Sequence, residues 1–558
     1  MANILTPLSL WNDFKELLDT QSKIISTKES DLMTVDKLEF SGRDTGKGRV
    51  RVAAAFAWNT NSPSKETVLI MPDSKDTIDE KVLEFFVSKG YSALMVDYRG
   101  EWKDCDFYTR YPENIEYANL LKCGRHKDYV DDSADKTSWY EWVSLGLYAR
   151  KYIKERTGSE NIAVVGFRDG GEIAWKLGVA GKFSCIIPVC AAGWSAYYGI
   201  SKYITKDPRM DDERYRFIAG IDSQAYAPYV KCPVLMLCST NDKRFDYDRA
   251  YDTFSRINPE FAKGSALSYS VLTNSCIGVK SCSNMIIFLD KYLRKKDIIV
   301  PKTAEVVVET DEKQNLIAKA LYDDVCEIEE CVMYLAEDCL DSSSREWNVC
   351  PLKKVVSSKE RHFFLNVYEK PSTIFVFCHV RYKNGITIWS KIVVRKLNGK
   401  FRNMQKKNKV LYTNTYGAEG FSIADPEKNA IGGLMIADES LLPKLVEKSK
   451  GVKGLYSPCG LSSFRVNNPI YAPSVGNVLS IDVFCDKSES VNITFTDWNT
   501  GEEYSAVFNV VGGVWQKIIA ECKIFKNLNG VSLDNFEREM MFNITSLSPF
   551  AINNFIWL

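Results

Sequence analysis

The sequence predicts a multidomain protein with an N-terminal α/β domain, built on a mostly parallel sheet with helices on both faces, and two C-terminal all-β domains. The chain of 558 residues is too long for one hydrophobic core. Short apolar runs alternate with helical segments as far as residue 300, which is typical of a covered parallel sheet. Beyond residue 300 apolar and polar positions alternate with a period of two, which favours strands.

The α/β domain is expected at residues 34–300, after an N-terminal helical arm at 1–33. Two opening strands joined by a glycine-containing turn are predicted within 34–57. Buried parallel strands are then predicted at 67–71, 92–96, 162–166, 185–190, 233–239 and 268–272. Helices are predicted at 80–89, 138–157, 170–179, 248–256 and 283–294.

Two long insertions, 101–137 and 191–230, follow strand ends. Because ligands bind at the carboxyl ends of such strands, we expect these insertions to form a lid and pocket walls. Both are rich in aromatic residues, and the ligand-binding candidates among them are Trp102, Tyr108, Trp194, Tyr197 and Tyr198. Such rings suit sugars or aromatic ligands, and they serve equally well as the core beneath a long loop.

Strand-like alternation predicts a small, immunoglobulin-like β-sandwich at 302–397 and a mostly β region at 410–558, whose layout resembles a carbohydrate-binding jelly roll. A basic linker at 396–409 is expected between them. A short helical piece is expected at 438–449. The C-terminal region resembles carbohydrate-binding modules in its Gly-x-Trp strand and its apolar closing strand. That resemblance implies sugar stacking on Trp498 or Tyr504, and a purely structural sandwich is the alternative.

Composition narrows the function classes. Lys plus Arg and Asp plus Glu each number 72, which leaves no electrostatic footprint for nucleic acid or an anionic membrane. The opening residues lack the pattern of a secretory signal, and no stretch is apolar enough to span a membrane. Sixteen scattered cysteines favour reduced thiols in a cytoplasmic protein, with no disulfide frame, metal site or cofactor. The oligomeric state is not indicated.

The segment 162–171, Ile-Ala-Val-Val-Gly-Phe-Arg-Asp-Gly-Gly, carries the most specific motif. It resembles the nucleophile elbow of α/β-hydrolases, in which a G-x-S-x-G turn joins a strand to a helix. Arg168 stands in place of the serine. The segment 232–242 is similar to the strand and acid turn of esterases and places Asp242 at the triad acid. The segment 96–100 is similar to the Asp-x-Arg-Gly stretch of dienelactone hydrolases and acyl esterases. These matches cover about half the chain.

Two of the three positions of the triad depart from the family pattern. Arg168 cannot be a nucleophile because arginine stays protonated, and residues 270–276, where the histidine is expected, contain none. Asp242 without that histidine cannot orient a base. The resemblance therefore implies an esterase-like fold in which ordinary ester hydrolysis is slow or absent.

Replacement catalytic groups are few. If Asp169 were a displaced nucleophile, Phe167 would stand where the tight turn needs glycine. The favoured interpretation is therefore that Asp169 is a carboxylate near a helix N-terminus that pairs with Arg168. Of the three histidines, only His126, in the first insertion, could reach the crevice as a base, and a surface loop position is favoured. The nearest thiols by topology are Cys105, Cys123 and Cys276.

Arg168 itself has two interpretations. Projecting into the pocket, it would favour a carboxylate, phosphate or sulfate. Paired with Asp169, Asp242 or Asp97, it would fill the site that the nucleophile occupies in the family, and this second interpretation is favoured.

The leading function is a pseudoenzyme that binds a small molecule or carbohydrate. The alternatives are an active hydrolase, a carbohydrate or small-acyl esterase with a non-standard constellation, and a scaffold for self-association. A rewired enzyme needs a nucleophile and base in contact, a binder needs an open pocket, and a scaffold needs a filled one.

Overall fold

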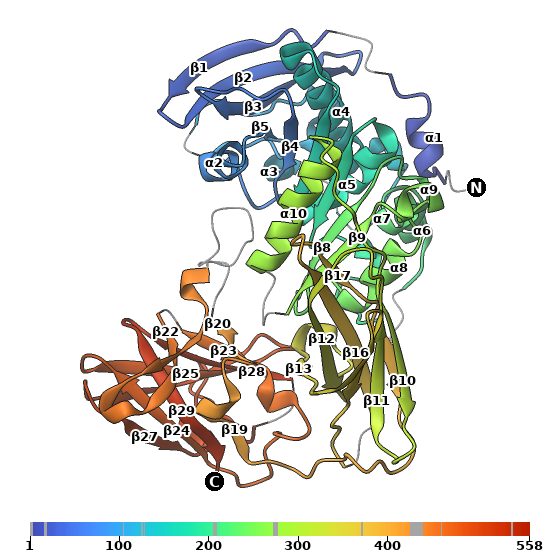
Figure 1. The fold of residues 1–558 in the computed structure, drawn as a ribbon. Helices are drawn as coiled ribbons and strands as arrows, with labels where there is room; N and C mark the ends of the chain where they lie inside the picture. The colour runs from blue at the N-terminus through green and yellow to red at the C-terminus, as the bar shows by residue number, and fades with distance from the viewer. Residues whose placement is uncertain are drawn as a thin grey trace.

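The structure is a computed structural model that describes residues 4–15, 19–103, 105–123, 127, 129–204, 209–271, 277–369, 372–424, 439–458, 460–536 and 539–558. Its N-terminal half is built on one nine-stranded sheet (Figure 1). In sheet order the strands are β1 (Lys23–Glu29), β2 (Met33–Asp44), β3 (Arg49–Asn59), β5 (Ser92–Val96), β4 (Thr67–Met71), β6 (Ile162–Phe167), β7 (Cys185–Val189), β8 (Leu235–Ser239) and β9 (Ala266–Ser270).

Strand direction identifies the fold. The pairs β1–β2, β2–β3 and β3–β5 are antiparallel, and every pair from β5 to β9 is parallel. Without the extra edge strand β1, the order is 1-2-4-3-5-6-7-8 with the second strand reversed, which is the order of the α/β-hydrolase fold. The predicted fold class is confirmed.

Helices cover both faces of this sheet. The apolar cluster on one face includes side chains of α4 (Ser138–Thr157) and α5 (Asp169–Ala180). The cluster on the other face includes α2 (Glu80–Ser88) and α10 (Val279–Tyr292). The strands β4 to β9 are buried at every position, which explains their continuous apolar runs in the sequence. None of the described helices has the length and apolarity needed to cross a membrane.

The expected helical arm is wrong in its second half. The only helix described in residues 1–33 is the five-residue α1 (Pro7–Trp11), and β1 follows it as an edge strand. Every residue of β1 is exposed, so the strand has no buried face to produce a period-two pattern. Backbone pairing with β2 forms it instead.

The two insertions are folded as short helical pieces. The first contains the 3₁₀ helices η1 (Glu113–Ala118) and η2 (Ala134–Lys136) and the helix α3 (Leu120–Cys123). The second contains η3 (Ser195–Tyr197), α6 (Asp212–Gly220), α7 (Ser223–Tyr226) and η4 (Ala227–Tyr229). The turn η5 (Tyr247–Arg249) and the helices α8 (Ala250–Phe254) and α9 (Pro259–Ala262) lie between β8 and β9.

A middle sandwich of two antiparallel sheets follows. One sheet contains β10 (Glu305–Thr310), β11 (Leu316–Leu321), β15 (Glu360–Phe364) and β14 (Leu352–Ser357). The other contains β13 (Asn348–Val349), β12 (Ile328–Glu337), β16 (Thr373–Tyr382), β17 (Thr387–Trp389) and β18 (Val393–Lys396). Its apolar core is continuous with that beneath α10, and the Asn284 amide of α10 exchanges two hydrogen bonds of 2.8 Å with the backbone of Thr387. The middle sandwich is therefore packed onto the hydrolase-fold domain.

The C-terminal sandwich has a separate core. One sheet contains β19 (Val410–Tyr412), β21 (Lys444–Glu447), β22 (Lys453–Ser457), β24 (Leu479–Cys485), β27 (Gln516–Ala520) and β29 (Phe550–Trp557). The other contains β20 (Ser422–Ile423), β23 (Leu461–Ser463), β25 (Glu489–Asp497), β26 (Glu503–Val510) and β28 (Met540–Ser546). The helix expected at 438–449 is wrong: the 3₁₀ turn η9 (Glu439–Leu441) and β21 occupy most of it, because β21 pairs with β22 as a hairpin.

Candidate functional site

Arg168 occupies the elbow between β6 and α5 in a strained backbone conformation, with φ 50° and ψ −111°. Positive φ is rare for a long side chain, and a hydrogen bond of 2.8 Å from its N–H to the carbonyl of Val189 helps to hold it. A Cβ added at Gly166 would lie 2.0 Å from the carbonyl oxygen of Gly170. The elbow therefore keeps its tight backbone although its central residue is arginine.

The Arg168 side chain is 9% exposed and lies among carboxylates. Burial, together with the negative charge of the neighbouring Asp73, raises the pKa of Asp76 to about 6. The positive charge of Arg168 opposes that rise. Burial also raises the pKa of Asp242, and Arg168 is the strongest opposing charge there. The base of the site is thus occupied by a charge cluster, as expected if Arg168 fills the place of the old nucleophile.

Asp242 stands beyond the end of β8, where the sequence placed the triad acid. Its Oδ1 accepts a hydrogen bond of 2.8 Å from the backbone N–H of Arg244. Its Oδ2 is buried and has no hydrogen-bond partner in the described part of the chain. The thiol of Cys190, at the end of β7, also hydrogen-bonds this carboxylate. The acid is therefore present, with one oxygen unsatisfied.

Asp169 is held by cations. Its Oδ2 lies 2.5 Å from the ammonium of Lys127, 3.6 Å from a guanidinium nitrogen of Arg244, and accepts a hydrogen bond from the Ser74 hydroxyl. Burial alone would raise the pKa of Asp169, but the charges of Lys127 and Arg244 hold it below its usual value. Because its charge is compensated, Asp169 is a poor nucleophile.

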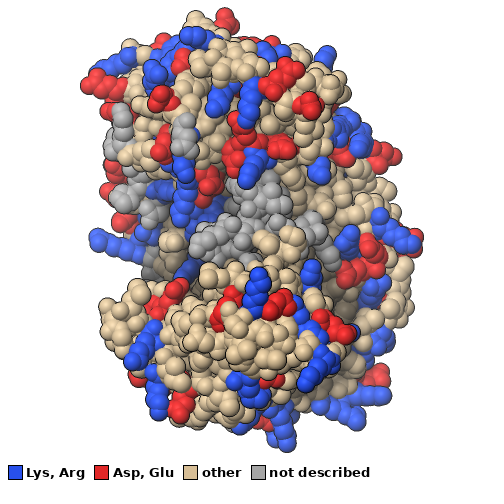
Figure 2. Space-filling view, turned by 90° about the vertical axis from the view of Figure 1, so that its left-hand side faces the viewer, with Lys and Arg blue, Asp and Glu red and all other residues tan. Residues whose placement is uncertain are grey.

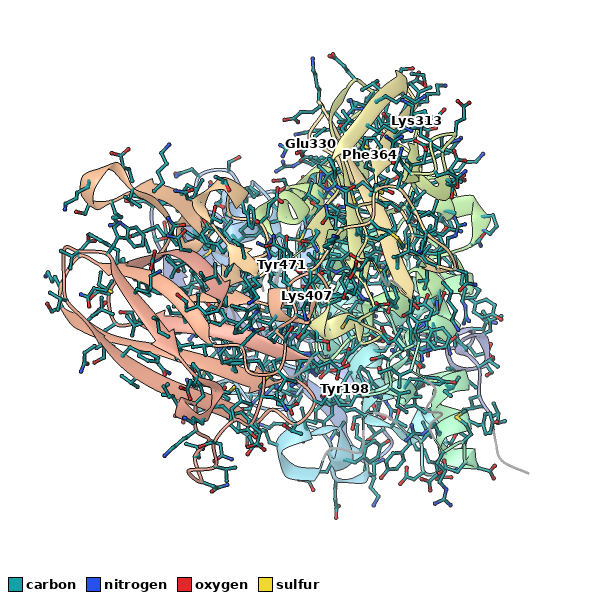
Figure 3. All side chains as sticks on the ribbon, turned by 90° about the horizontal axis from the view of Figure 1, so that it is seen from below. Tyr198, Lys313, Glu330, Phe364, Lys407 and Tyr471 are labelled. Atoms are coloured by element: carbon teal, nitrogen blue, oxygen red, sulfur yellow. The ribbon has the colours of Figure 1, made fainter. Side chains whose placement is uncertain are left out.

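A cavity of about 630 Å³ lies above this cluster and is lined by all three domains. Trp194, Tyr197 and Tyr198 of the second insertion form one wall. The middle sandwich contributes Asp341, Ser342 and Ser343, and the C-terminal sandwich contributes Trp498 and Asn499. Figure 3 shows Tyr198 beside the C-terminal sandwich. The expectation that the second insertion walls a pocket is confirmed.

The three residues of the aromatic wall differ in how their neighbours hold them. The indole N–H of Trp194 donates to Thr253 Oγ1 at 3.0 Å, and the guanidinium of Arg249 lies 4.6 Å from the ring centre of Tyr197. Tyr198 is 64% exposed. Trp194 and Tyr197 are thus fixed, while Tyr198 presents its ring at the mouth of the cavity.

Trp498 joins the C-terminal sandwich to the other two domains. Its indole N–H donates to Ser343 Oγ at 2.7 Å, and the ammonium of Lys243 lies 4.4 Å from its ring centre. One face and the N–H are therefore already in use. The sequence predicted sugar stacking for Trp498; in the structure Trp498 lines the cavity as part of a joint between domains.

Other sequence candidates lie away from the cavity lining or outside the described residues. Trp102 is 6% exposed in the core on the α2 face, and Tyr108 and Cys105 pack against the same core. Tyr504 packs against the C-terminal core, and its hydroxyl donates to Glu502. These rings fill space beneath loops, the alternative noted for aromatic-rich insertions. His126, Cys276 and the side chain of Cys123 lie outside the described residues.

Sequence reasoning missed Ser74, Lys127, Cys190 and Arg244. Lys127 lies in an insertion whose path the sequence does not reveal, and Ser74 and Cys190 follow β4 and β7 without a motif. The one available signal was position, since Ser74, Cys190 and Arg244 all follow the carboxyl ends of parallel strands. No group of three His, Cys, Asp or Glu side chains among the described residues is arranged to hold a metal.

The second insertion is anchored by a buried charge cluster on α5. Glu172 accepts hydrogen bonds from the N–H of Gly193 at 2.9 Å and from the hydroxyl of Ser223. The ammonium of Lys176 lies 3.1 Å from that hydroxyl and 3.9 Å from Glu172. Asp222 Oδ1 accepts from the N–H of Ser195, while its buried Oδ2 has no partner. The cluster fixes one wall of the cavity.

Asp222 should make folding stability depend on pH. Burial, together with the charge of Glu172, raises its pKa from 3.8 to about 7. Between these values the folded protein holds a proton that the unfolded chain has lost, so this group reduces stability as pH rises from about 4 to about 7. Asp222→Asn should remove that slope and stabilise the protein at pH 8, on the order of 1 kcal/mol or more. Urea unfolding from pH 5 to 8.5 measures it, and equal slopes in both proteins would contradict the prediction.

Comparisons with known proteins show similarity to esterases at low identity. No protein-family model and no curated protein matches the chain. An acetyl xylan esterase from Paenibacillus sp. R4 is 14% identical, with a TM-score of 0.40, over 51% of this chain and 92% of its own. Acetyl xylan esterase 1 from Thermoanaerobacterium sp. JW/SL YS485 is 15% identical, with a TM-score of 0.34, over 47% and 84%. An esterase from Pyrococcus furiosus is 14% identical, with a TM-score of 0.32, over 52% and 98%. The strand order identifies the fold without them.

Proposed function

We propose that this chain is an esterase-like α/β-hydrolase homologue that binds a small molecule or carbohydrate in the three-domain cavity without hydrolysing it. One observation carries the proposal: Arg168 holds the nucleophile's backbone position, while a cavity of about 630 Å³ remains open above it. Loss of the nucleophile removes the chemistry, and retention of the cavity preserves a place for a ligand.

The described residues of the cavity do not combine a nucleophile with an imidazole base. His362 and His379 lie on β15 and β16 of the middle sandwich, and neither lines the cavity. The sequence 270–276 after the last strand holds no histidine. Asp242 can therefore stabilise a neighbouring charge but has no described imidazole to orient.

An active hydrolase is the second candidate, and Cys190 favours it. Its thiol lines the cavity and hydrogen-bonds Asp242. A carboxylate is a weak base toward a thiol, because the ordinary pKa of a carboxyl lies several units below that of a thiol. We rank this candidate second for that reason. A pure scaffold ranks third because the cavity is not filled.

The wild-type protein should not hydrolyse short-chain acyl esters or acetylated sugars above the rate of buffer. Arg168→Ser should also stay inactive, since it restores the hydroxyl without a histidine. Release of acetate or a chromogenic alcohol measures this, with Cys190→Ala as the variant that detects the second candidate. Turnover in wild type that Cys190→Ala or Asp242→Ala abolishes would overturn the proposal and establish a rewired enzyme.

A further inference from the structure

The carboxylates around the cavity differ in how many hydrogen bonds and ion pairs they receive from the protein. Five carboxylate residues line it: Asp169, Glu172, Asp242, Asp246 and Asp341. Asp169 and Glu172 have the partners given above. Asp246 accepts from the hydroxyl of Ser342 at 2.9 Å and from the backbone N–H of Lys202 at 2.8 Å. Asp341 accepts from the N–H of Ser343 at 2.9 Å. None of these four described carboxylates has a buried oxygen without a hydrogen-bond donor.

Asp242 is the exception among these five. Its residue is 2% exposed, and its Oδ2 accepts no hydrogen bond from any residue that the structure describes. A buried carboxylate oxygen without a donor is unfavourable, because it has lost its hydrogen bonds to water and gained none from the protein. Its position in the lining points to a ligand that brings a donor, such as a hydroxyl, to that oxygen.

Two ammonium groups at the rim are not engaged with carboxylates. Lys75 and Lys243 are exposed and line the cavity. Among the described residues neither of them forms an ion pair, and the Lys243 ammonium lies over the ring of Trp498. Lys and Arg side chains gather at the indentation between the upper and lower parts of the molecule in Figure 2. Because Asp242, the lining carboxylate with an oxygen left unsatisfied, is buried at the base, the unmatched charge at the exposed rim is positive.

We propose that the cavity binds an anionic sugar, with a hydroxyl donating to Asp242 Oδ2 and the carboxylate or phosphate meeting Lys243 and Lys75. This inference rests on the proposed binding function and names the ligand class for the same cavity. The fixed ring of Tyr197 and the exposed ring of Tyr198 offer apolar surface to the C–H face of a sugar. Hydroxyl and anion are both required, since each meets a different unsatisfied group.

Isothermal titration calorimetry of the full chain separates the two requirements. The probes are glucuronate, glucose 6-phosphate, glucose as the neutral sugar, and cyclohexanecarboxylate as a ring acid without hydroxyls. Glucuronate or glucose 6-phosphate should bind at least about ten-fold more tightly than both single-feature probes, about 1.4 kcal/mol. Whichever of the two binds more tightly identifies carboxylate or phosphate as the anionic group.

Variants connect that preference to the cavity. Lys243→Met keeps an apolar stem on Trp498 and should weaken the anionic sugar about three- to ten-fold while leaving glucose unchanged. Lys263→Met, on an exposed lysine outside the lining, is the matched control and should change nothing. Asp242→Asn should weaken the anionic sugar and glucose alike, with the melting temperature showing that the variant is folded. Added salt should weaken only the anionic probes.

Two results would overturn the inference. Glucose binding as tightly as glucuronate and glucose 6-phosphate would show that charge plays no part, and would leave the proposed binding function intact. Equal effects of Lys243→Met and Lys263→Met would show that the rim lysines are merely solvated. If no probe binds and the wild type hydrolyses acyl esters, the proposed function fails together with this inference.

Discussion

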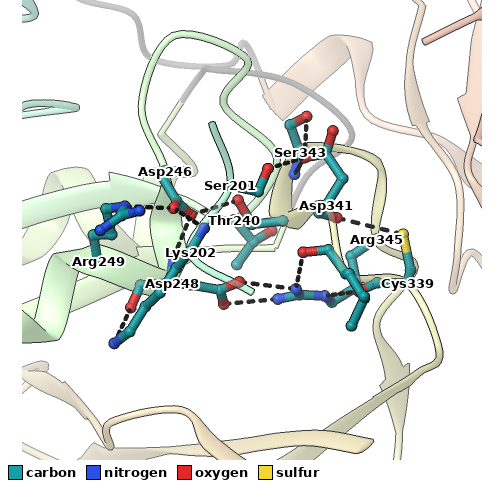
Figure 4. A network of polar contacts seen from close by, with 12 residues as sticks. Ser201, Lys202, Thr240, Asp246, Asp248, Arg249, Cys339, Asp341, Ser343 and Arg345 are labelled. Atoms are coloured by element: carbon teal, nitrogen blue, oxygen red, sulfur yellow. Dashed lines mark hydrogen bonds and ion pairs between the residues drawn. The ribbon is translucent and has the colours of Figure 1, made fainter. Parts of the chain in front are cut away.

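Arg345→Met should lower the free energy of unfolding by about 3–5 kcal/mol, because it leaves a buried carboxylate without its cation. Arg345, in the middle sandwich, forms two hydrogen bonds of 2.8 and 2.9 Å with Asp248 of the hydrolase-fold domain, and both side chains are 0% exposed (Figure 4). Its guanidinium also lies 3.6 Å from the ring centre of Phe375. Methionine keeps the apolar stem and removes every donor. Urea unfolding followed by tryptophan fluorescence measures the loss.

Two controls separate this pair from charge loss in general. Lys28→Met removes a surface ion pair with Glu80, whose side chains are 70% and 37% exposed, and should cost less than about 1 kcal/mol. The double variant Arg345→Met, Asp248→Leu replaces both charges with apolar groups and should recover much of the loss. A single-variant loss as small as that of Lys28→Met would show that the joint between the domains does not depend on this pair.

The loop around Arg345 holds all three domains together. Glu346, the next residue, accepts from Arg465 of the C-terminal sandwich at 2.7 Å, with both side chains nearly buried. The amide of Asn241 donates to the carbonyl of Arg345 at 2.7 Å, and the amide of Asn467 donates to the carbonyl of Ser344 at 2.9 Å. Two adjacent residues, Arg345 and Glu346, thus pair with different domains.

This arrangement could not be predicted from the sequence. The stretch 341–346, Asp-Ser-Ser-Ser-Arg-Glu, has the composition of a solvated loop. Its side chains are largely buried only because segments a hundred residues away supply their partners. Local patterns did predict the exact bounds of the strands β4 and β5 and of the helix α4. The two strands are continuous apolar runs because every residue in them is buried, and the helix shows apolar residues at helical spacing. The strand β1 was not predicted, because it has no buried face and therefore no alternating apolar pattern.

The candidate site likewise contains residues that local sequence patterns predict and residues that only the tertiary structure brings together. Arg168 and Asp242 were found because a strand and a following turn fix their positions locally. Lys127 and Arg244, which hold Asp169, depend on how an insertion and a loop cross the sheet edge. The sequence left open whether Arg168 binds an anion or fills the old site. In the structure Arg168 lies among the carboxylates of Asp73, Asp76 and Asp242, which favours the second interpretation, and the space above it is open.

Gly170→Ala should destabilise the protein by about 3 kcal/mol or more, or prevent folding, although no chemistry depends on it. A Cβ there would lie 2.0 Å from the carbonyl oxygen of Met71 and 2.4 Å from that of Pro72, and these backbone atoms at the end of β4 cannot turn away as a side chain could. Gly278→Ala is the matched control, because its Cβ would meet only the Ser270 hydroxyl at 3.6 Å, and it should cost less than about 1 kcal/mol. Soluble yield and urea unfolding measure both variants.

Equal stability of the two glycine variants would mean that the elbow can relax, and that its glycines remain for another reason. The expected difference has a consequence for interpreting such motifs. Gly166 is required by the tight turn into α5, and Gly170 by the close approach of α5 to the end of β4, whatever residue stands between them. An elbow with its glycines and without its serine therefore indicates the fold and the location of a cavity, while the chemistry depends on Arg168 and on the groups that surround it.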